Sequence, residues 1–242
     1  MTSECIVETE HTNIPLYADG YPGIMFQISD NGCLLLPKNK KLSELFLYGQ
    51  TIDPIAIDIA GKHQFVVVQL YPFASKYLLN VDPKELNDDC YDLLQIEAPN
   101  IKGFHEQLLN AKDNITRIKI LSDLIRALIK THQVSENDRV EQVISLIIES
   151  GGQIKISEIL AQVYMTERTL ERQFTAQIGL TPKQFAKIIQ FKSSISRLTE
   201  SHYNSLLEVG LDCGFSDQSH FIRTFKSYTG QTPSFYLNHL VR

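Results

Sequence analysis

The chain has 242 residues, 43% of them hydrophobic and 21% charged, and a formal net charge of −5, which fits two folded domains with cores of their own. No stretch approaches the about 20 apolar residues of a membrane span, and the amino terminus has no basic segment followed by an apolar run, so we expect neither a membrane nor a secreted protein. The cysteines, Cys5, Cys33, Cys90 and Cys213, form no CxxC pair, and we expect a cytoplasmic protein with reduced thiols.

Short apolar runs predict strands in the amino-terminal part. The runs 23–29 and 33–37 flank Asp30-Asn31-Gly32, a sequence typical of a β-hairpin turn. Further apolar runs follow at residues 45–48, 55–59 and 65–71. Several short strands at near-regular spacing predict a small β-barrel or sandwich.

From about Lys102 to Lys130 the apolar residues recur at helical spacing. The helix expected over 115–129 has two apolar faces, more than one packing surface needs, and this surplus motivates a homodimer through that helix. The polar segment Thr131 to Asn137 has no periodicity and is the expected linker. The expected domains are therefore residues 1–134, β-rich with helices at about 102–130, and residues 135–242.

The carboxy-terminal part contains one helical unit twice. Arg172 recurs 51 residues later as Arg223, and at the same offset recur Phe174 as Phe225, Gly179 as Gly230, and Thr181-Pro182 as Thr232-Pro233. Helices over about 166–178 and 217–229 are expected to end at the glycines, because the residue after a helix often needs a positive φ. A shorter amphipathic helix precedes each, at 156–163 and 206–213, and such a pair is typical of a helix-turn-helix unit.

The segment Gly214 to Phe221, Gly-Phe-Ser-Asp-Gln-Ser-His-Phe, resembles the signature of the AraC/XylS class of bacterial transcription regulators. The resemblance covers roughly residues 137–242, although Leu160 and Gly210 stand where the family usually has alanine. It implies a seven-helix DNA-binding domain with two helix-turn-helix units joined by a long helix, here from Pro182 to about Thr199. The expected fold class is therefore α+β: a small β-barrel or sandwich with helices, followed by an all-α domain.

A central helix of that length is about 27 Å long, so it could hold the second helices of both units, the reading helices, near the ~34 Å repeat of DNA. On the first, Arg168, Glu171 and Arg172 point together, opposite the buried stripe. The matching positions on the second are Gln218, Ser219, Ile222 and Arg223.

These side chains can recognise DNA. Arginine pairs with guanine or grips phosphate, glutamate accepts from cytosine, glutamine pairs with adenine, and isoleucine touches a thymine methyl. The positions also match base-contacting positions of the family. The alternative for each is a solvated surface side chain, with the arginines paired to Glu171 or other carboxylates. His220 is expected to be a packing or capping residue.

In the resembling family the amino-terminal domain is often cupin-like, and it often senses a small molecule or mediates dimerisation. Aromatic side chains of this part either fill its core or line an effector pocket. Activation is the commoner outcome in the family, which makes RNA polymerase a candidate partner, although no residue here indicates a polymerase contact.

The net charge of the carboxy-terminal part does not by itself indicate DNA binding. Residues 137–242 hold eleven lysines and arginines against ten aspartates and glutamates, a net of +1. Histidines and cysteines have no metal-ligand spacing, and no catalytic triad order, phosphate loop or dinucleotide motif is present, so we expect no enzyme, no metal and no cofactor. The alternative to a DNA-binding regulator is a helical protein-interaction scaffold, which would not require Arg172 and Arg223 at equivalent positions.

Overall fold

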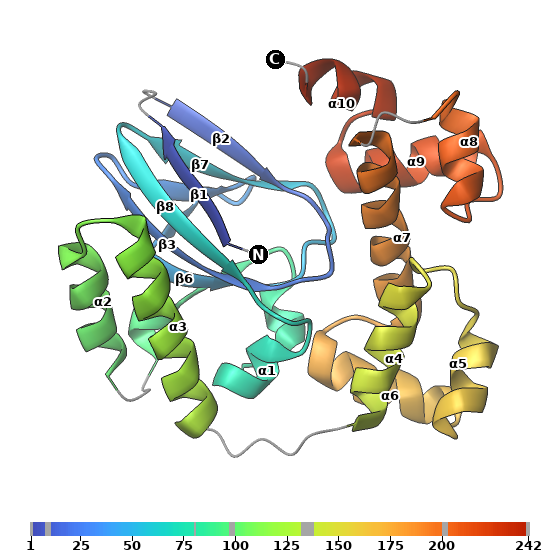
Figure 1. Cartoon of the computed structure of the whole chain (residues 1–242), viewed down its shortest axis with the longest axis horizontal. Helices are drawn as coiled ribbons and strands as arrows, with labels where there is room; N and C mark the ends of the chain where they lie inside the picture. The colour runs from blue at the N-terminus through green and yellow to red at the C-terminus, as the bar shows by residue number, and fades with distance from the viewer. Residues whose placement is uncertain are drawn as a thin grey trace.

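The computed structural model of the chain describes residues 2–7, 11–79, 81–96, 100–131, 138–199 and 203–240. Figure 1 shows a β-rich amino-terminal part lying beside a helical carboxy-terminal part. Within the described ranges, no helix has the length and apolarity needed to cross a membrane. The expected domain boundary and the expected linker, Thr131 to Asn137, lie outside the described residues except for Thr131, which ends a helix.

The amino-terminal part contains two antiparallel sheets. The first has the strand order β1-β8-β3-β6-β9 and the second the order β2-β7-β4-β5. The strands are β1 (Thr2–Val7), β2 (His11–Leu16), β3 (Gly23–Ser29), β4 (Cys33–Leu36), β5 (Lys40–Leu42), β6 (Leu45–Tyr48), β7 (Ile55–Ala60), β8 (His63–Gln69) and β9 (Cys90–Asp92). The sheets form a sandwich rather than a closed barrel, and the α+β class is confirmed.

The central strand of the first sheet, β3, is buried on both faces. Along β3, Ile24 and Phe26 belong to a core shared with the helices α2 (Ile101–Asn110) and α3 (Asn114–Thr131), while Met25 belongs to the core between the two sheets. This alternation follows from the pleat of a strand, which sends successive side chains to opposite faces. The helical pattern at 102–130 is confirmed as these two helices, which cover one face of the sheet (Figure 1).

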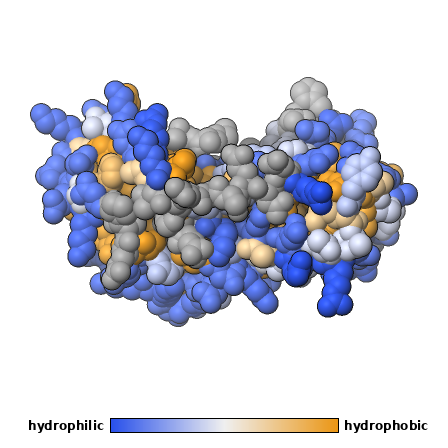
Figure 2. All heavy atoms as spheres, turned by 90° about the horizontal axis from the view of Figure 1, so that it is seen from below, coloured by the Kyte–Doolittle hydropathy of each residue, from blue (hydrophilic) through white to orange (hydrophobic). Residues whose placement is uncertain are grey.

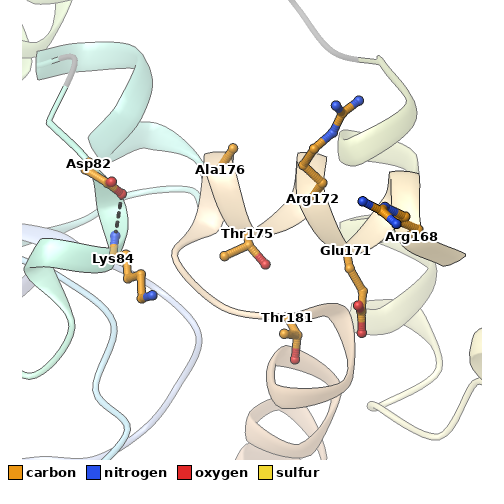
Figure 3. A pocket seen from close by; sticks show the side chains of 8 residues that line it. All are labelled: Asp82, Lys84, Arg168, Glu171, Arg172, Thr175, Ala176 and Thr181. Atoms are coloured by element: carbon orange, nitrogen blue, oxygen red, sulfur yellow. Dashed lines mark hydrogen bonds between the residues drawn. The ribbon is translucent and has the colours of Figure 1, made fainter.

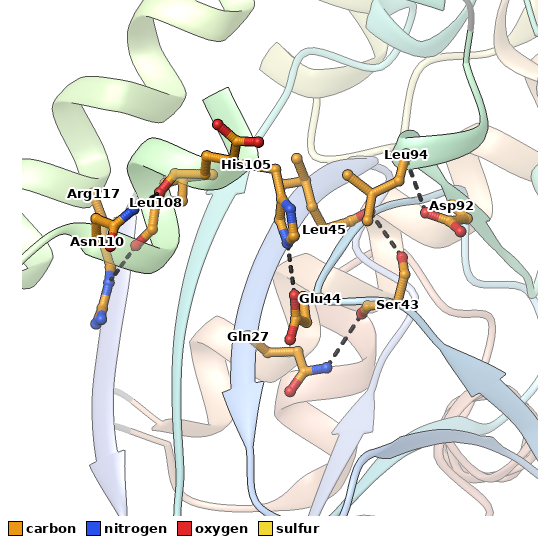
Figure 4. Close-up of polar contacts among 11 residues, drawn as sticks. Gln27, Ser43, Glu44, Leu45, Asp92, Leu94, His105, Leu108, Asn110 and Arg117 are labelled. Atoms are coloured by element: carbon orange, nitrogen blue, oxygen red, sulfur yellow. Dashed lines mark hydrogen bonds and ion pairs between the residues drawn. The ribbon is translucent and has the colours of Figure 1, made fainter. Parts of the chain in front are cut away.

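Polar contacts join the helices to the sheet (Figure 4). His105 of α2 lies 2.6 Å from a carboxylate oxygen of Glu44. The buried Arg117 of α3 donates to Asn114 Oδ1 at 2.8 Å and to Gln64 Oε1 at 2.6 Å, and its guanidinium lies over the Phe26 ring. These hydrogen bonds lower the cost of burying the guanidinium, because buried donors without a partner are destabilising.

The predicted hairpin between β3 and β4 is wrong. Strand β3 pairs with β6 and β8, while β4 pairs with β5 and β7, so the Asp30-Asn31-Gly32 turn carries the chain from one sheet to the other. It is held by the neighbouring β7–β8 connection, where Asp30 N donates to Lys62 O and Ala60 N donates to Gly32 O. The turn sequence indicates a reversal of the chain but does not determine which strands pair.

The carboxy-terminal part has seven helices between residues 138 and 240, the described portion of this domain. They are α4 (Asp138–Glu149), α5 (Ile156–Val163), α6 (Glu167–Ile178), α7 (Pro182–Thr199), α8 (Leu206–Asp212), α9 (Gln218–Thr229) and α10 (Pro233–Leu240). The predicted helix-turn-helix pairs are α5–α6 and α8–α9, and the predicted central helix is α7. Figure 1 places the two pairs at opposite ends of α7. The amino-terminal part also contains the short segments α1 (Ala74–Leu79), η1 (Pro83–Leu86) and η2 (Leu93–Gln95). In the sequence, α1 and η1 lie between β8 and β9, and η2 follows β9.

The two parts share an apolar junction. Ala18, just after β2, is buried in the same core as Phe185 and Ile189 of α7. The rings of Tyr17 and Tyr236 meet edge to face, 5.6 Å apart. The amino-terminal part thus packs along α7 and reaches α10.

A second contact between the parts lies at the end of α6. Asn87, just after η1, donates through Nδ2 to Gly179 O at 3.0 Å. Gly179 has φ +81°, and a Cβ there would lie 2.7 Å from the Pro83 backbone, so only glycine fits both the helix end and the contact. Gly230 ends α9 in the same way, with φ +73° and open space around it.

This difference gives a matched pair of substitutions. Gly230→Ala should lower the free energy of unfolding by about 1 kcal/mol, because only the backbone conformation is disfavoured. Gly179→Ala should lower it by roughly 2 kcal/mol or more, because the methyl group also displaces η1. Urea unfolding of the full chain measures both, and equal losses would contradict the contact.

Candidate nucleic-acid interface

The first reading helix, α6, is built by local signals. Thr166 caps it, its hydroxyl accepting from Thr169 N at 3.3 Å, and Gly179 ends it in the left-handed region. One side, Leu170, Phe174 and Ile178, is buried. The predicted site residues of this helix, Arg168, Glu171 and Arg172, are all exposed on the other side.

The second reading helix, α9, repeats this design. Asp217 caps it through a 2.7 Å bond from His220 N, and this bond holds the pKa of the Asp217 carboxyl below its usual range. Phe221 and Phe225 are buried. The predicted residues Gln218, Ser219 and Arg223 are exposed, and Ile222 is half-buried. The His220 ring packs edge-on against Phe215, 5.4 Å away, as a packing residue would.

The central helix contacts each reading helix through an aromatic pair. Phe185 of α7 packs against Phe174 of α6 with ring centroids 5.6 Å apart, and Phe191 of α7 packs against Phe225 of α9 at 5.4 Å. Phe174 and Phe225 are the residues that recur at the repeat offset. The sequence-predicted residues therefore form two exposed clusters, one near each end of a helix about 27 Å long.

The exposed side of α6 opens into a recess of about 590 Å³ (Figure 3). It is lined by Asp82, Lys84, Arg168, Glu171, Arg172, Thr175, Ala176 and Thr181. Asp82 and Lys84 come from η1 and its cap, and they lie across the recess from α6 in Figure 3. Sequence reasoning missed these two residues, because no local pattern reports a contact between segments almost a hundred residues apart.

Charged groups also meet at the middle of α7. Lys192 Nζ lies 3.9 Å from the centre of the Tyr21 ring, which places a cation against an aromatic face. The neighbouring Asp19 accepts from Tyr21 N at 2.9 Å and from Gln69 Nε2. Burial raises the pKa of Asp19 and lowers that of Lys192, and the attraction between the two groups opposes both shifts.

Two separate families match this chain, one in each part. Residues 159–239 match a family described as a helix-turn-helix domain. Residues 2–92 match a family described as a domain of unknown function, DUF6597.

Individual relatives match about half of the chain. The transcriptional activator RhaS of Klebsiella pneumoniae (strain 342) is 30% identical over 105 residues, which are 43% of this chain and 37% of RhaS. An uncharacterised helix-turn-helix-type transcriptional regulator of Staphylococcus aureus (strain MSSA476), SAS0078, is 26% identical over 137 residues, 54% of this chain and 18% of that protein. The chain thus spans well under half the length of these relatives.

The fold as a whole has a solved counterpart. ToxT from Vibrio cholerae aligns over 94% of this chain and 97% of its own, with a TM-score of 0.54 and 15% sequence identity. At this identity the likeness concerns the fold, namely a β-rich part followed by two helix-turn-helix units.

Proposed function

We propose that the whole protein is a sequence-specific DNA-binding regulator of transcription of the AraC family, with residues 159–239 as its helix-turn-helix domain. In this proposal α6 and α9 enter successive major grooves on one side of a duplex. A protein acting on bacterial DNA in this way works in the cytoplasm.

One observation carries the proposal. Arg172 and Arg223 occupy the same position in the two units, both are exposed, and each belongs to a helix fixed to α7 by a buried phenylalanine pair. Two arginine forks held at a set separation match two binding positions on a regular polymer. A surface that only mediated protein packing would not need them.

The remaining residues have roles that follow from their chemistry. Arg168 and Arg172 bind guanine edges or phosphate, and Glu171 accepts from cytosine. On α9, Gln218 recognises adenine, Ser219 donates to base or backbone, and Ile222 contacts a thymine methyl. With a net charge of only +1 in residues 137–242, non-specific affinity is weak, and base contacts supply a large share of the binding free energy.

We assign effector sensing to the amino-terminal part, because it packs along α7 and holds the end of α6, so a change there would reach the reading helices. ToxT, the solved counterpart, has been crystallised with an unsaturated fatty acid. A small molecule is therefore the effector class that we propose, without assigning its identity from a fold likeness. Activation, with RNA polymerase as the partner, is supported by the likeness to RhaS.

We also propose a homodimer through the outer side of α2 and α3. The two apolar faces noted for residues 115–129 are mostly absorbed by the core, since Leu121, Leu124 and Leu128 are buried with Ile118, Ile120 and Ile125 packed around them. Ile115 and Ile129 stay exposed, as does Leu109 of α2. Figure 2 shows apolar side chains at the surface over this part of the molecule.

Each of the paired arginines should contribute to DNA binding. On a DNA site selected from a random pool by the purified full chain, Arg172→Ala and Arg223→Ala should each cost roughly 1–3 kcal/mol of binding free energy and relax preference at separate base positions. The free energy of unfolding should change by less than about 0.5 kcal/mol, because both side chains are exposed.

Binding isotherms on the selected site and on random DNA separate the outcomes. A loss shared equally by both DNAs would identify phosphate contacts instead of base contacts. No loss with either variant would favour the protein-interaction scaffold.

The protein should activate transcription and respond to a small-molecule effector. Placed at a promoter, the selected site should raise transcription by RNA polymerase when the protein is added, and the DNA selection should change when metabolites from a cell extract are present. Unchanged or lower transcript levels would contradict activation, and an identical selection with and without extract would contradict effector sensing.

The full chain should form a homodimer in solution. At micromolar concentration, light scattering after size-exclusion chromatography should give twice the 27.5 kDa chain mass, and Ile115→Glu with Ile129→Glu should give the single mass. A matched pair on α8, Leu207→Glu with Leu211→Glu, also replaces exposed apolar side chains and should leave the dimer intact. A wild-type monomer would contradict the proposal.

A further inference from the structure

The turn between α5 and α6 contains a residue in an uncommon backbone conformation. Tyr164 ends α5 with φ 52° and ψ 46°, in the left-handed region. Among the described residues, the other non-glycine positions with positive φ are Asn39, Asp88 and Asn100. Asparagine and aspartate enter this region routinely, because their short polar side chains bond locally, whereas the Cβ of a tyrosine is disfavoured there.

Packing does not offset this conformational cost. The Tyr164 side chain is 89% exposed, while Val163 before it is buried and Met165 after it packs into the core. The chain therefore presents a large aromatic side chain to solvent from a backbone conformation that opposes it. Strained residues that persist without a packing reason concentrate at functional sites.

The second unit supplies an internal comparison. Its turn between α8 and α9 has a buried residue, Cys213, then Gly214 with φ +80°, then the core residue Phe215. Gly214 thus corresponds to Tyr164. A Cβ on Gly214 would meet the Gln153 side chain at 2.8 Å, and that side chain donates to Asp212 O at 3.1 Å. A glutamine side chain lies beside the left-handed residue of one turn, and the left-handed residue of the other is an exposed tyrosine.

We propose that Tyr164 contacts the sugar-phosphate backbone of DNA beside the groove that α6 enters, with its hydroxyl donating to a phosphate oxygen. The inference rests on the proposed function. Tyr164 lies two residues before the helix cap Thr166. In a helix-turn-helix unit the reading helix meets base edges with its amino-terminal residues while the preceding helix crosses the backbone, so the turn between them lies over the groove edge.

The chemistry of tyrosine fits this place. Tyrosine hydroxyls are among the groups that bond phosphate oxygens, and such contacts fix the position of a protein on the duplex without selecting sequence. At 89% exposure, Tyr164 is available to such a partner. A glycine in its place, as in the second unit, forms the turn but has no side chain to bond a phosphate. Only the first unit therefore makes this backbone contact.

Two substitutions test the proposal on the full chain. Tyr164→Phe removes only the hydroxyl and should weaken binding about tenfold, because hydrogen bonds to charged groups are among the stronger ones. The loss should be equal on selected and random DNA. The dependence of affinity on salt should stay the same, because no charge is removed. Tyr91→Phe, on the outer strand β9, is the control and should bind as the wild type does.

Tyr164→Gly separates the contact from the fold. It should bind DNA at least as weakly as Tyr164→Phe while unfolding at an equal or higher urea concentration, because glycine adopts the turn without penalty. Unfolding at lower urea would show that Tyr164 has a structural role and would overturn the proposal. So would Tyr164→Phe binding within twofold of the wild type. Failure of the wild type to bind any selected DNA would instead overturn the proposed function.

Discussion

The structure depends on the aromatic packing that joins α7 to the two reading helices. Phe185 with Phe174 and Phe191 with Phe225 are fully buried pairs, and each pairs a residue of the central helix with the same position of the repeated unit. Close-packed interiors resist small displacements, so neither reading helix can turn without opening its core. The separation of the exposed clusters is therefore a property of one continuous helix rather than of a linker.

The sequence predicted the carboxy-terminal part closely because its signals are local. A capping threonine or aspartate, an apolar residue every third or fourth position and a terminal glycine determine where α6 and α9 begin and end, and which side they bury. The exposure of Arg168, Arg172 and Arg223 followed from the same periodicity. The sequence also shows a tyrosine, Tyr164, in the first turn and a glycine, Gly214, in the second, but only the structure shows that Tyr164 has a left-handed backbone conformation.

Long-range pairing was beyond such reasoning. The Asp30-Asn31-Gly32 turn has the composition of a hairpin, yet its flanking strands enter different sheets, because each finds its partners far along the chain. The placement of η1 beside α6 is likewise invisible locally, since nothing near Lys84 indicates a helix almost a hundred residues away. Both features arise from how preformed layers pack, and only the three-dimensional arrangement contains that information.

The apolar junction along α7 makes the two halves poor candidates for exchange between proteins. Phe185, Ile189 and Tyr236 contribute to a core that also contains Ala18, so a carboxy-terminal fragment cut free would present this strip to water. A chimera that joined these reading helices to an unrelated partner domain would need a matching strip to cover it. Recombination in this architecture thus requires compatible surfaces, in addition to a suitable linker.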